Sequence, residues 1–260
     1  MDLGIEVILE LFSKNGLENL FQVSSFKFEE FGENAQRIFS LQQDYIKTID
    51  NVIAFLQGKN PTLARQICSG NFLPEASRFD AYNNDPDASG WAFGSMGMQD
   101  KAKHLATLYL EDLSDFIVEC VDENFGFSRY AERLGRSANS FDELYEVLNT
   151  EPTYIDEITL SIFKERMEKV QPKLVCFSVP FPGNLYSAFR CAQFLKTNFP
   201  EIKIAMGGGF PNTELRDLKD VRVFEFFDFI TLDDGELPIE LLNQNICQTE
   251  LVEVQYKRTL

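Results

Sequence analysis

An alternation of short apolar runs and helical stripes after Pro172 is the feature that most limits how this chain can fold. Residues 174–179, 202–206 and 228–232 have the length of strands, and a helical pattern follows each of them. The first run is almost continuously apolar, which is typical of a strand covered on both faces in a parallel sheet. Strands that alternate with helices form parallel sheets with right-handed crossovers. The sequence therefore predicts an α/β fold with a flavodoxin-like or Rossmann-like parallel sheet.

The chain before this point has a helical period instead. Apolar side chains recur at helical spacing within residues 11–21, 38–56, 105–120 and 155–170. Asn15-Gly16 predicts a break in the first of these stretches. We therefore expect two parts, a mainly helical region over residues 1–170 and an α/β region over residues 171–260.

Residues 77–98 interrupt the helical pattern. They have no helical period and contain three glycines, so we expect a long structured loop of the kind that often makes contacts. Residues 85–90 imitate the start of an EF-hand calcium loop, but Met96 stands at position twelve, where such a loop needs a bidentate Glu. An Asp- and Asn-rich turn is the prediction for this segment.

The charge balance excludes several classes of partner. The chain has 24 Lys and Arg against 41 Asp and Glu, a net charge of −17, and a surface this acidic repels phosphate backbones. No apolar run approaches the roughly 18 residues of a membrane span, and residues 1–11 lack the basic start of a signal peptide. We expect a cytoplasmic protein with no nucleic-acid partner and no membrane partner.

Cysteine and histidine usage argues against local metal chemistry. The cysteines are at least 15 positions apart, which does not fit a zinc or iron–sulfur ligand motif. They are Cys68, Cys120, Cys176, Cys191 and Cys247. Their odd number and apolar surroundings predict buried free thiols. His104 is the only histidine, and its helical context predicts a helix-surface or packing role. We therefore predict no catalytic residue and no metal-ligand set in this chain.

Polar residues and glycines follow each predicted strand. Ligands of open parallel sheets bind beyond the carboxyl ends of the strands, so these three loops are candidate binding positions. The predicted cofactor-binding residues are Ser178, Asn184, Ser187, Gly207, Gly208, Gly209, Asp233, Gly235 and Glu236. Consecutive glycines let a ligand approach the backbone closely. Each loop also has a simpler interpretation: helix capping by the hydroxyl and amide groups, a tight packing turn at the glycines, and a solvated acidic turn at the carboxylates.

Three segments of the predicted sheet region carry a family resemblance. They are Val175-Cys-Phe-Ser-Val-Pro-Phe-Pro-Gly183, Ile204-Ala-Met-Gly-Gly-Gly-Phe-Pro-Asn-Thr-Glu214 and Phe229-Ile-Thr-Leu-Asp-Asp-Gly-Glu236. In sequence and spacing they resemble the cobalamin-binding-type domain that precedes the catalytic barrel of radical S-adenosylmethionine (radical SAM) enzymes. Upstream segments resemble the helical insert of one branch of that family: residues 54–64, 71–75, 90–94 and 103–106. The resemblance implies a cobalamin-binding fold with a large N-terminal helical insert.

The resemblance also implies what lies outside this chain. There is no C-x-x-x-C-x-x-C motif, so the 4Fe-4S cluster and S-adenosylmethionine would belong to a downstream barrel domain. Relatives also carry a first strand and helix before the segment that matches residues 2–6. We therefore expect a domain fragment of a longer enzyme that is catalytically silent alone, with the radical SAM barrel as its partner.

Cobalamin is the cofactor that the resemblance makes possible. In the family, a glycine pair after the second of these strands makes room for the nucleotide tail of the cofactor, and Gly207, Gly208 and Gly209 match that position. The D-x-H-x-x-G motif that supplies a cobalt ligand is absent, because Ala102 and Thr107 occupy its Asp and Gly positions around His104. Members of the radical class often lack this motif as well.

Three hypotheses of function follow. The first is an accessory domain that positions a corrinoid or a substrate next to the radical site. The second is a cofactor-free docking domain with the same fold. The third is an independent nucleotide-binding enzyme, against which the absent G-x-G-x-x-G and P-loop motifs count. A missing first strand would leave strand 174–179 with an open edge. We therefore expect either weak self-association through this strand or a cover from a segment of the chain itself, such as residues 252–256.

Overall fold

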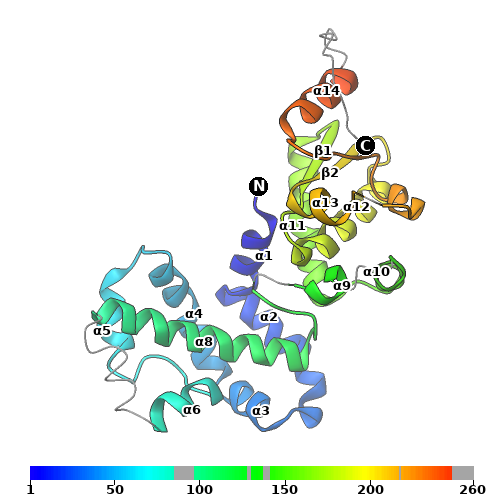
Figure 1. Ribbon diagram of the computed structural model, residues 1–260. Coiled ribbons are helices and arrows are strands. Elements are labelled where there is room, and N and C mark those ends of the chain that lie inside the picture. Colours follow the sequence, from blue (N-terminus) through cyan, green and yellow to red (C-terminus); the bar gives the residue numbers. More distant parts are fainter. Residues whose placement is uncertain (85–96, 128–129, 137–140, 217, 248–260) are drawn as a thin grey trace. The chain divides into compact units, whose positions relative to one another are not determined.

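The chain divides into two compact units. The computed structural model describes residues 1–84, 97–127, 130–136, 141–216 and 218–247 (Figure 1). One unit comprises Met1–Ser128 and Thr153–Thr159, and the other comprises Arg129–Pro152 and Leu160–Leu260. We expected the helical region to extend to residue 170, whereas this division groups much of 129–170 with the sheet. Within the described ranges, no helix combines the length and the apolar character that crossing a bilayer requires.

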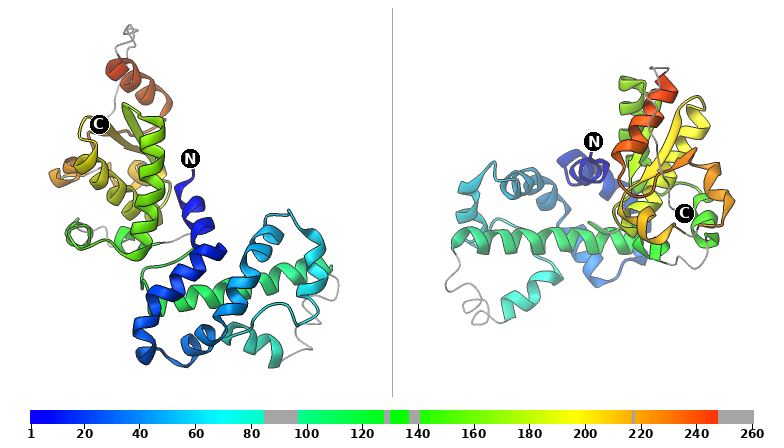
Figure 2. Two further views of the ribbon diagram at one scale, coloured as in Figure 1. Left: turned by 180° about the vertical axis from the view of Figure 1, so that it is seen from behind. Right: turned by 45° about the horizontal axis from the view of Figure 1, so that its top comes forward.

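The first unit is built from helices. Its elements are α1 (Leu3–Leu11), α2 (Lys14–Ser24), η1 (Ser25–Glu30), α3 (Glu33–Ser40), α4 (Gln42–Leu56), η2 (Pro61–Leu63), α5 (Ala64–Ile67), α6 (Ser77–Asn84), α8 (Met98–Cys120) and the start of α11 (Tyr154–Val170). Helices α3, α4, α5 and α6 all contact α8, and Figures 1 and 2 show them arranged along its length. Tyr109, Leu113 and Phe116 of α8 are fully buried, as the helical spacing predicted.

The break between α1 and α2 falls at Phe12 and Ser13, not at Asn15-Gly16 as predicted. The Ser13 hydroxyl oxygen accepts the N–H of Gly16 at 3.0 Å and thereby caps α2. Gly16 lies inside α2, where a Cβ would stand 2.1 Å from the carbonyl oxygen of Glu10. This glycine therefore permits close packing of two consecutive helices instead of ending one.

Helix α6 occupies residues 77–84, so the prediction of a loop over 77–98 is wrong for this part. The EF-hand look-alike at 85–96 lies outside the described residues. Asp112 of α8 is fully buried, and its carboxylate accepts the N–H groups of Ala76 and Arg78, each at 3.0 Å. Burial raises the pKa of Asp112. The start of α6 is thus capped by a carboxylate from another helix, which no local sequence pattern indicates.

The second unit contains the sheet. Its elements are α9 (Glu132–Arg136), α10 (Asp142–Leu148), the rest of α11, β1 (Leu174–Ser178), η3 (Pro182–Asn184), α12 (Leu185–Asn198), β2 (Lys203–Gly207), α13 (Gly209–Glu214), η4 (Val221–Glu225), β3 (Phe229–Ile230) and α14 (Glu236–Cys247). The strands are parallel and lie in the order β1-β2-β3. The predicted α/β class is therefore confirmed, with a small three-stranded sheet in the described part of the chain.

Aromatic side chains join this sheet to its helices. The ring of Phe177 in β1 lies 5.8 Å from that of Phe163 in α11 and 6.1 Å from that of Phe227. Phe227 in turn lies 4.9 Å from Phe189 of α12, edge to face. Phe163, Phe189 and Phe227 are buried. Such contacts bury large apolar areas, which holds α11 and α12 against the sheet.

Cys176 and Ser178 of β1 are exposed, which corrects the prediction that this strand is covered on both faces. Within the described residues it pairs with β2 alone. Residues 252–256, the expected alternative to self-association at its open edge, lie outside the described residues. Cys120 and Cys191 are buried as expected, but Cys176 of β1 is exposed and Cys68 is half-buried. An apolar run predicts a strand, but its position in the sheet depends on which strands pair with it.

Arg190 of α12 explains why α10 belongs to the same unit as the sheet. Its side chain is only 2% exposed. The guanidinium donates to the carbonyl oxygens of Leu148 at 2.9 Å and Val147 at 3.2 Å. These carbonyls close the C-terminal end of α10, where the helix dipole favours a cation. A buried charged contact thus fastens a helix that precedes the strands in the sequence.

Candidate functional site

The three loops that follow the strands lie on one edge of the sheet. Ser178 pairs with Gly207 in the parallel register, and β3 continues the same direction. The carboxyl ends of all three strands therefore meet, as the sequence alternation predicted. We call this edge, formed by residues 178–187, 207–212 and 231–236, the strand-end edge.

The predicted polar site residues are accessible at the strand-end edge. Ser178, Asn184, Asp233 and Glu236 are exposed, and Ser187 is half-buried in the first turn of α12. Asn184 occupies the N-cap position of α12, but its side chain makes no capping hydrogen bond. Helix capping therefore does not account for this amide. Gly235, also half-buried, immediately precedes α14.

Gly208 joins the first two loops. Its φ of +108° lies in the region that favours glycine. A Cβ at this position would stand 2.8 Å from the backbone nitrogen of Val179. The Val179 N–H donates to the Gly207 carbonyl oxygen at 2.8 Å, and the Phe210 N–H donates to the Val179 carbonyl oxygen at 3.0 Å. Contact between these loops is therefore a sufficient reason for glycine here.

The neighbouring glycines also face protein atoms. A Cβ at Gly207 would stand 2.4 Å from the Thr231 hydroxyl oxygen, and one at Gly209 would stand 3.0 Å from the Pro180 carbonyl oxygen. Packing of the strand ends accounts for Gly208, and atoms of the chain also lie close to Gly207 and Gly209. Gly209 is nevertheless exposed, so its backbone is also open to a ligand.

Two residues that the sequence analysis missed tie the second and third loops together. The Asn212 side-chain amide donates to the Asp233 carbonyl oxygen at 3.1 Å, while its oxygen accepts the Asp233 N–H. Arg216 forms an ion pair with the Asp233 carboxylate and donates from Nε to the Asn212 carbonyl oxygen at 2.7 Å. Asp233 adopts a φ of +61°. Asn212 and Arg216 stand four positions apart after the glycines. Residues at this spacing are neighbours on a helix, so the sequence could have indicated that these two side chains act together.

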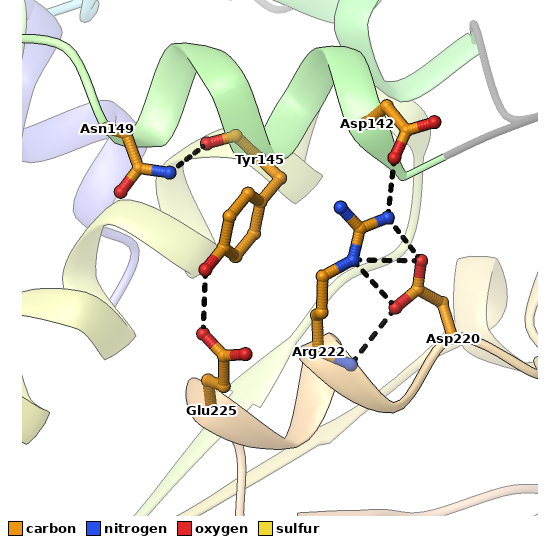
Figure 3. A network of polar contacts seen from close by, with 6 residues as sticks. All are labelled: Asp142, Tyr145, Asn149, Asp220, Arg222 and Glu225. Atoms are coloured by element: carbon orange, nitrogen blue, oxygen red, sulfur yellow. Dashed lines mark hydrogen bonds and ion pairs between the residues drawn. The ribbon is translucent and has the colours of Figure 1, made fainter.

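A second polar cluster links α10 to η4 (Figure 3). Arg222 donates to the carboxylates of Asp220 and Asp142, each at 2.6 Å, and its guanidinium lies 5.0 Å from the ring centroid of Tyr145. Tyr145 donates to Glu225 at 3.0 Å. The hydrogen bond from Arg222 holds the pKa of Asp220 below its usual value. Because carboxylates of the chain itself neutralise Arg222, this cluster fastens α10 to η4 and is not a strong candidate for ligand binding.

The donor set of the strand-end edge suits an organic cofactor better than a bare metal ion. Nowhere in the described part of the chain do three His, Cys, Asp or Glu side chains form a group that could hold a metal. His104 is exposed on α8, in the other unit, with its ring 6.3 Å from that of Tyr82. Its predicted place on a helix surface is confirmed. A corrinoid carries its own cobalt, so hydrogen-bonding groups such as Ser178 and Asn184 fit its amide periphery.

The fold and this edge define an α/β protein with a small parallel sheet and a separate helical unit. No protein-family model, curated protein or solved structure matches the chain. Evidence for function therefore comes from the sequence segments and from the geometry of the strand-end edge.

Proposed function

We propose that this chain is an accessory domain of the cobalamin-binding type that acts beside a radical SAM catalytic domain. The observation that supports this proposal is the convergence of the three segments that carry the family resemblance. Ser178, Gly209 and Asp233 come from three different loops and lie along one edge of the sheet. In this role the chain binds a corrinoid, or holds the substrate, next to the iron–sulfur centre of its partner. The chain itself supplies no catalytic residue.

The chain's own residues would hold the cofactor through its periphery. The Ser178 hydroxyl and the Asn184 amide both donate and accept hydrogen bonds. Both side chains are exposed at the strand-end edge. Arg216 and Asp233 form an ion pair at this edge, so the two side chains hold the second and third loops together and add no net charge there. The cobalt would be bound without a protein ligand from this edge.

Retention of cobalamin tests the proposal. Hydroxocobalamin is added to the purified chain, unbound cofactor is removed by desalting, and the visible spectrum is recorded. Ser178→Tyr places a ring over the edge from an exposed position and is expected to weaken binding by about tenfold or more, roughly 1.4 kcal/mol. Ser161→Tyr, at an exposed position of α11, is the matched control and leaves binding unchanged. A folded parent chain that retains no corrinoid contradicts cofactor binding.

A cofactor-free docking domain is the second candidate, and one observation favours it. All three glycines of the triplet pack against atoms of the chain itself, so a ligand is not needed to explain them. A docking domain remains colourless in the cobalamin test but binds a separately prepared catalytic domain. Ser178→Tyr then weakens this complex, and Ser161→Tyr does not.

A further inference from the structure

One aromatic side chain at the strand-end edge is not buried with its apolar neighbours. Phe181, in the loop after β1, is 69% exposed. Val179, Leu185 and Phe210 of the same edge are buried. Burying a phenylalanine ring removes a large apolar area from water and stabilises a fold. Packing within the described part of the chain therefore does not account for a phenylalanine at this position.

The backbone that carries this ring is held on both sides. A Cβ at Gly209 would stand 3.0 Å from the Pro180 carbonyl oxygen. A Cβ at Gly135 of α9 would stand 2.5 Å from the Pro182 carbonyl oxygen. The residue before a proline is also restricted to extended backbone, and Phe181 has φ −139° and ψ 162°. The ring is thus exposed from a backbone that needs little ordering when a ligand binds.

We propose that Phe181 packs against the face of the corrin ring when the chain binds its cofactor, an inference that rests on the proposed function. Sites for organic cofactors combine apolar contact with a few polar groups that fix orientation. A corrin is a flat macrocycle with an apolar face and amide groups at its rim. Ser178 and Asn184 stand three positions before and after Phe181, and both are exposed. Their hydrogen-bonding groups suit the amide rim, while the ring of Phe181 suits the face.

Substitution of Phe181 measures what this contact contributes to binding. Phe181→Ala removes the ring and is expected to weaken cobalamin binding by about tenfold or more. Phe181→Tyr keeps a flat aromatic face and is expected to bind like the parent chain. Phe224→Ala is the matched control, because Phe224 is a 53% exposed phenylalanine of the same unit that lies on η4, outside the strand-end edge. It is expected to leave binding unchanged.

Titration calorimetry with hydroxocobalamin and with cobinamide tests which part of the cofactor the ring contacts. Cobinamide has the corrin ring but lacks the nucleotide tail. Phe181→Ala is therefore expected to weaken the binding of both compounds by a similar factor. Urea unfolding of each variant provides the control for folding, and the exposed position of Phe181 predicts an unchanged midpoint. If Phe181→Ala unfolds more readily, Phe181→Leu keeps apolar bulk without a flat face and is read in the same way.

The results that overturn the contact of Phe181 with the corrin are distinguishable from failure of the proposed function. A parent chain that binds neither compound contradicts cofactor binding, and the contact with it. A parent chain that binds both, together with a Phe181→Ala variant that binds both as tightly, contradicts the contact alone. A loss confined to cobalamin shows that the ring contacts the nucleotide tail and overturns the contact with the corrin. Weak binding by Phe181→Tyr would show that an aromatic face is not what the cofactor contacts.

Discussion

Replacing Gly208 by alanine tests whether the glycine triplet holds the strand ends together. Gly208 adopts φ +108° and ψ −172°, a region that is essentially restricted to glycine. Holding another residue there costs on the order of 1–3 kcal/mol. The new Cβ would also stand 2.8 Å from the nitrogen and 2.9 Å from the oxygen of Val179. The loop after β1 must therefore move.

Two hydrogen bonds are disturbed by this movement. They run from the Val179 N–H to Gly207 at 2.8 Å and from the Phe210 N–H to Val179 at 3.0 Å, and each contributes roughly 1 kcal/mol net. Together with the strain, we expect Gly208→Ala to lower the free energy of unfolding of the second unit by about 2–4 kcal/mol. That is a large share of the roughly 5–15 kcal/mol that stabilises a typical domain.

Urea unfolding followed by far-UV circular dichroism measures this loss, and hydrogen exchange over residues 203–210 locates it. Gly209→Ala is the matched control. Gly209 has no left-handed φ, and its closest contact would be the Pro180 carbonyl oxygen at 3.0 Å, so the expected cost is below about 1 kcal/mol. If Gly208→Ala unfolds within about 0.5 kcal/mol of the parent chain, the contact between the loops does not determine this glycine.

Three further substitutions address the contacts that organise each unit. Asp112→Asn replaces one buried acceptor oxygen with a donor and should lower the free energy of unfolding of the first unit by about 1–3 kcal/mol, measured by urea unfolding. The more exposed Asp115→Asn should change this free energy by less than about 1 kcal/mol. Equal losses for the two variants would be evidence against the capping role of Asp112. Burial opposes ionisation of Asp228, but its hydrogen bond with Lys196 and other favourable contacts hold its pKa below the usual value. The contribution of Asp228 to stability is therefore present above about pH 4 and lost as the pH falls. Below that pH, the free energy of unfolding of the parent chain should decline more steeply than the free energy of unfolding of Asp228→Asn. Parallel pH profiles for the two proteins would contradict this role of Asp228. Arg222→Met should accelerate amide exchange in α10 without changing the first unit, and unchanged exchange in α10 would show that the cluster in Figure 3 does not fasten this helix.

The sequence alone determined the elements that depend on local patterns. The apolar runs predicted β1 and β2 almost to their observed ends, and helical spacing predicted α8. The alternation of strands and helices also predicted a parallel sheet with its loops on one edge. These predictions succeeded because the period of apolar residues follows directly from the geometry of a helix or a strand.

Only the tertiary structure decided which groups meet across the chain. Asp112 caps α6 from another helix, Arg190 closes the end of α10, and Gly208 packs against Val179. Each contact joins residues that are far apart in sequence, so periodicity within a segment carries no record of it. The same holds for Cys176: its apolar neighbours predicted a buried strand, but burial depends on what covers each face of the sheet. In the described part of the chain, β1 pairs with β2 alone and its other edge is open. The sequence of a segment indicates its propensity to form a strand, whereas strand pairing is a property of the whole sheet.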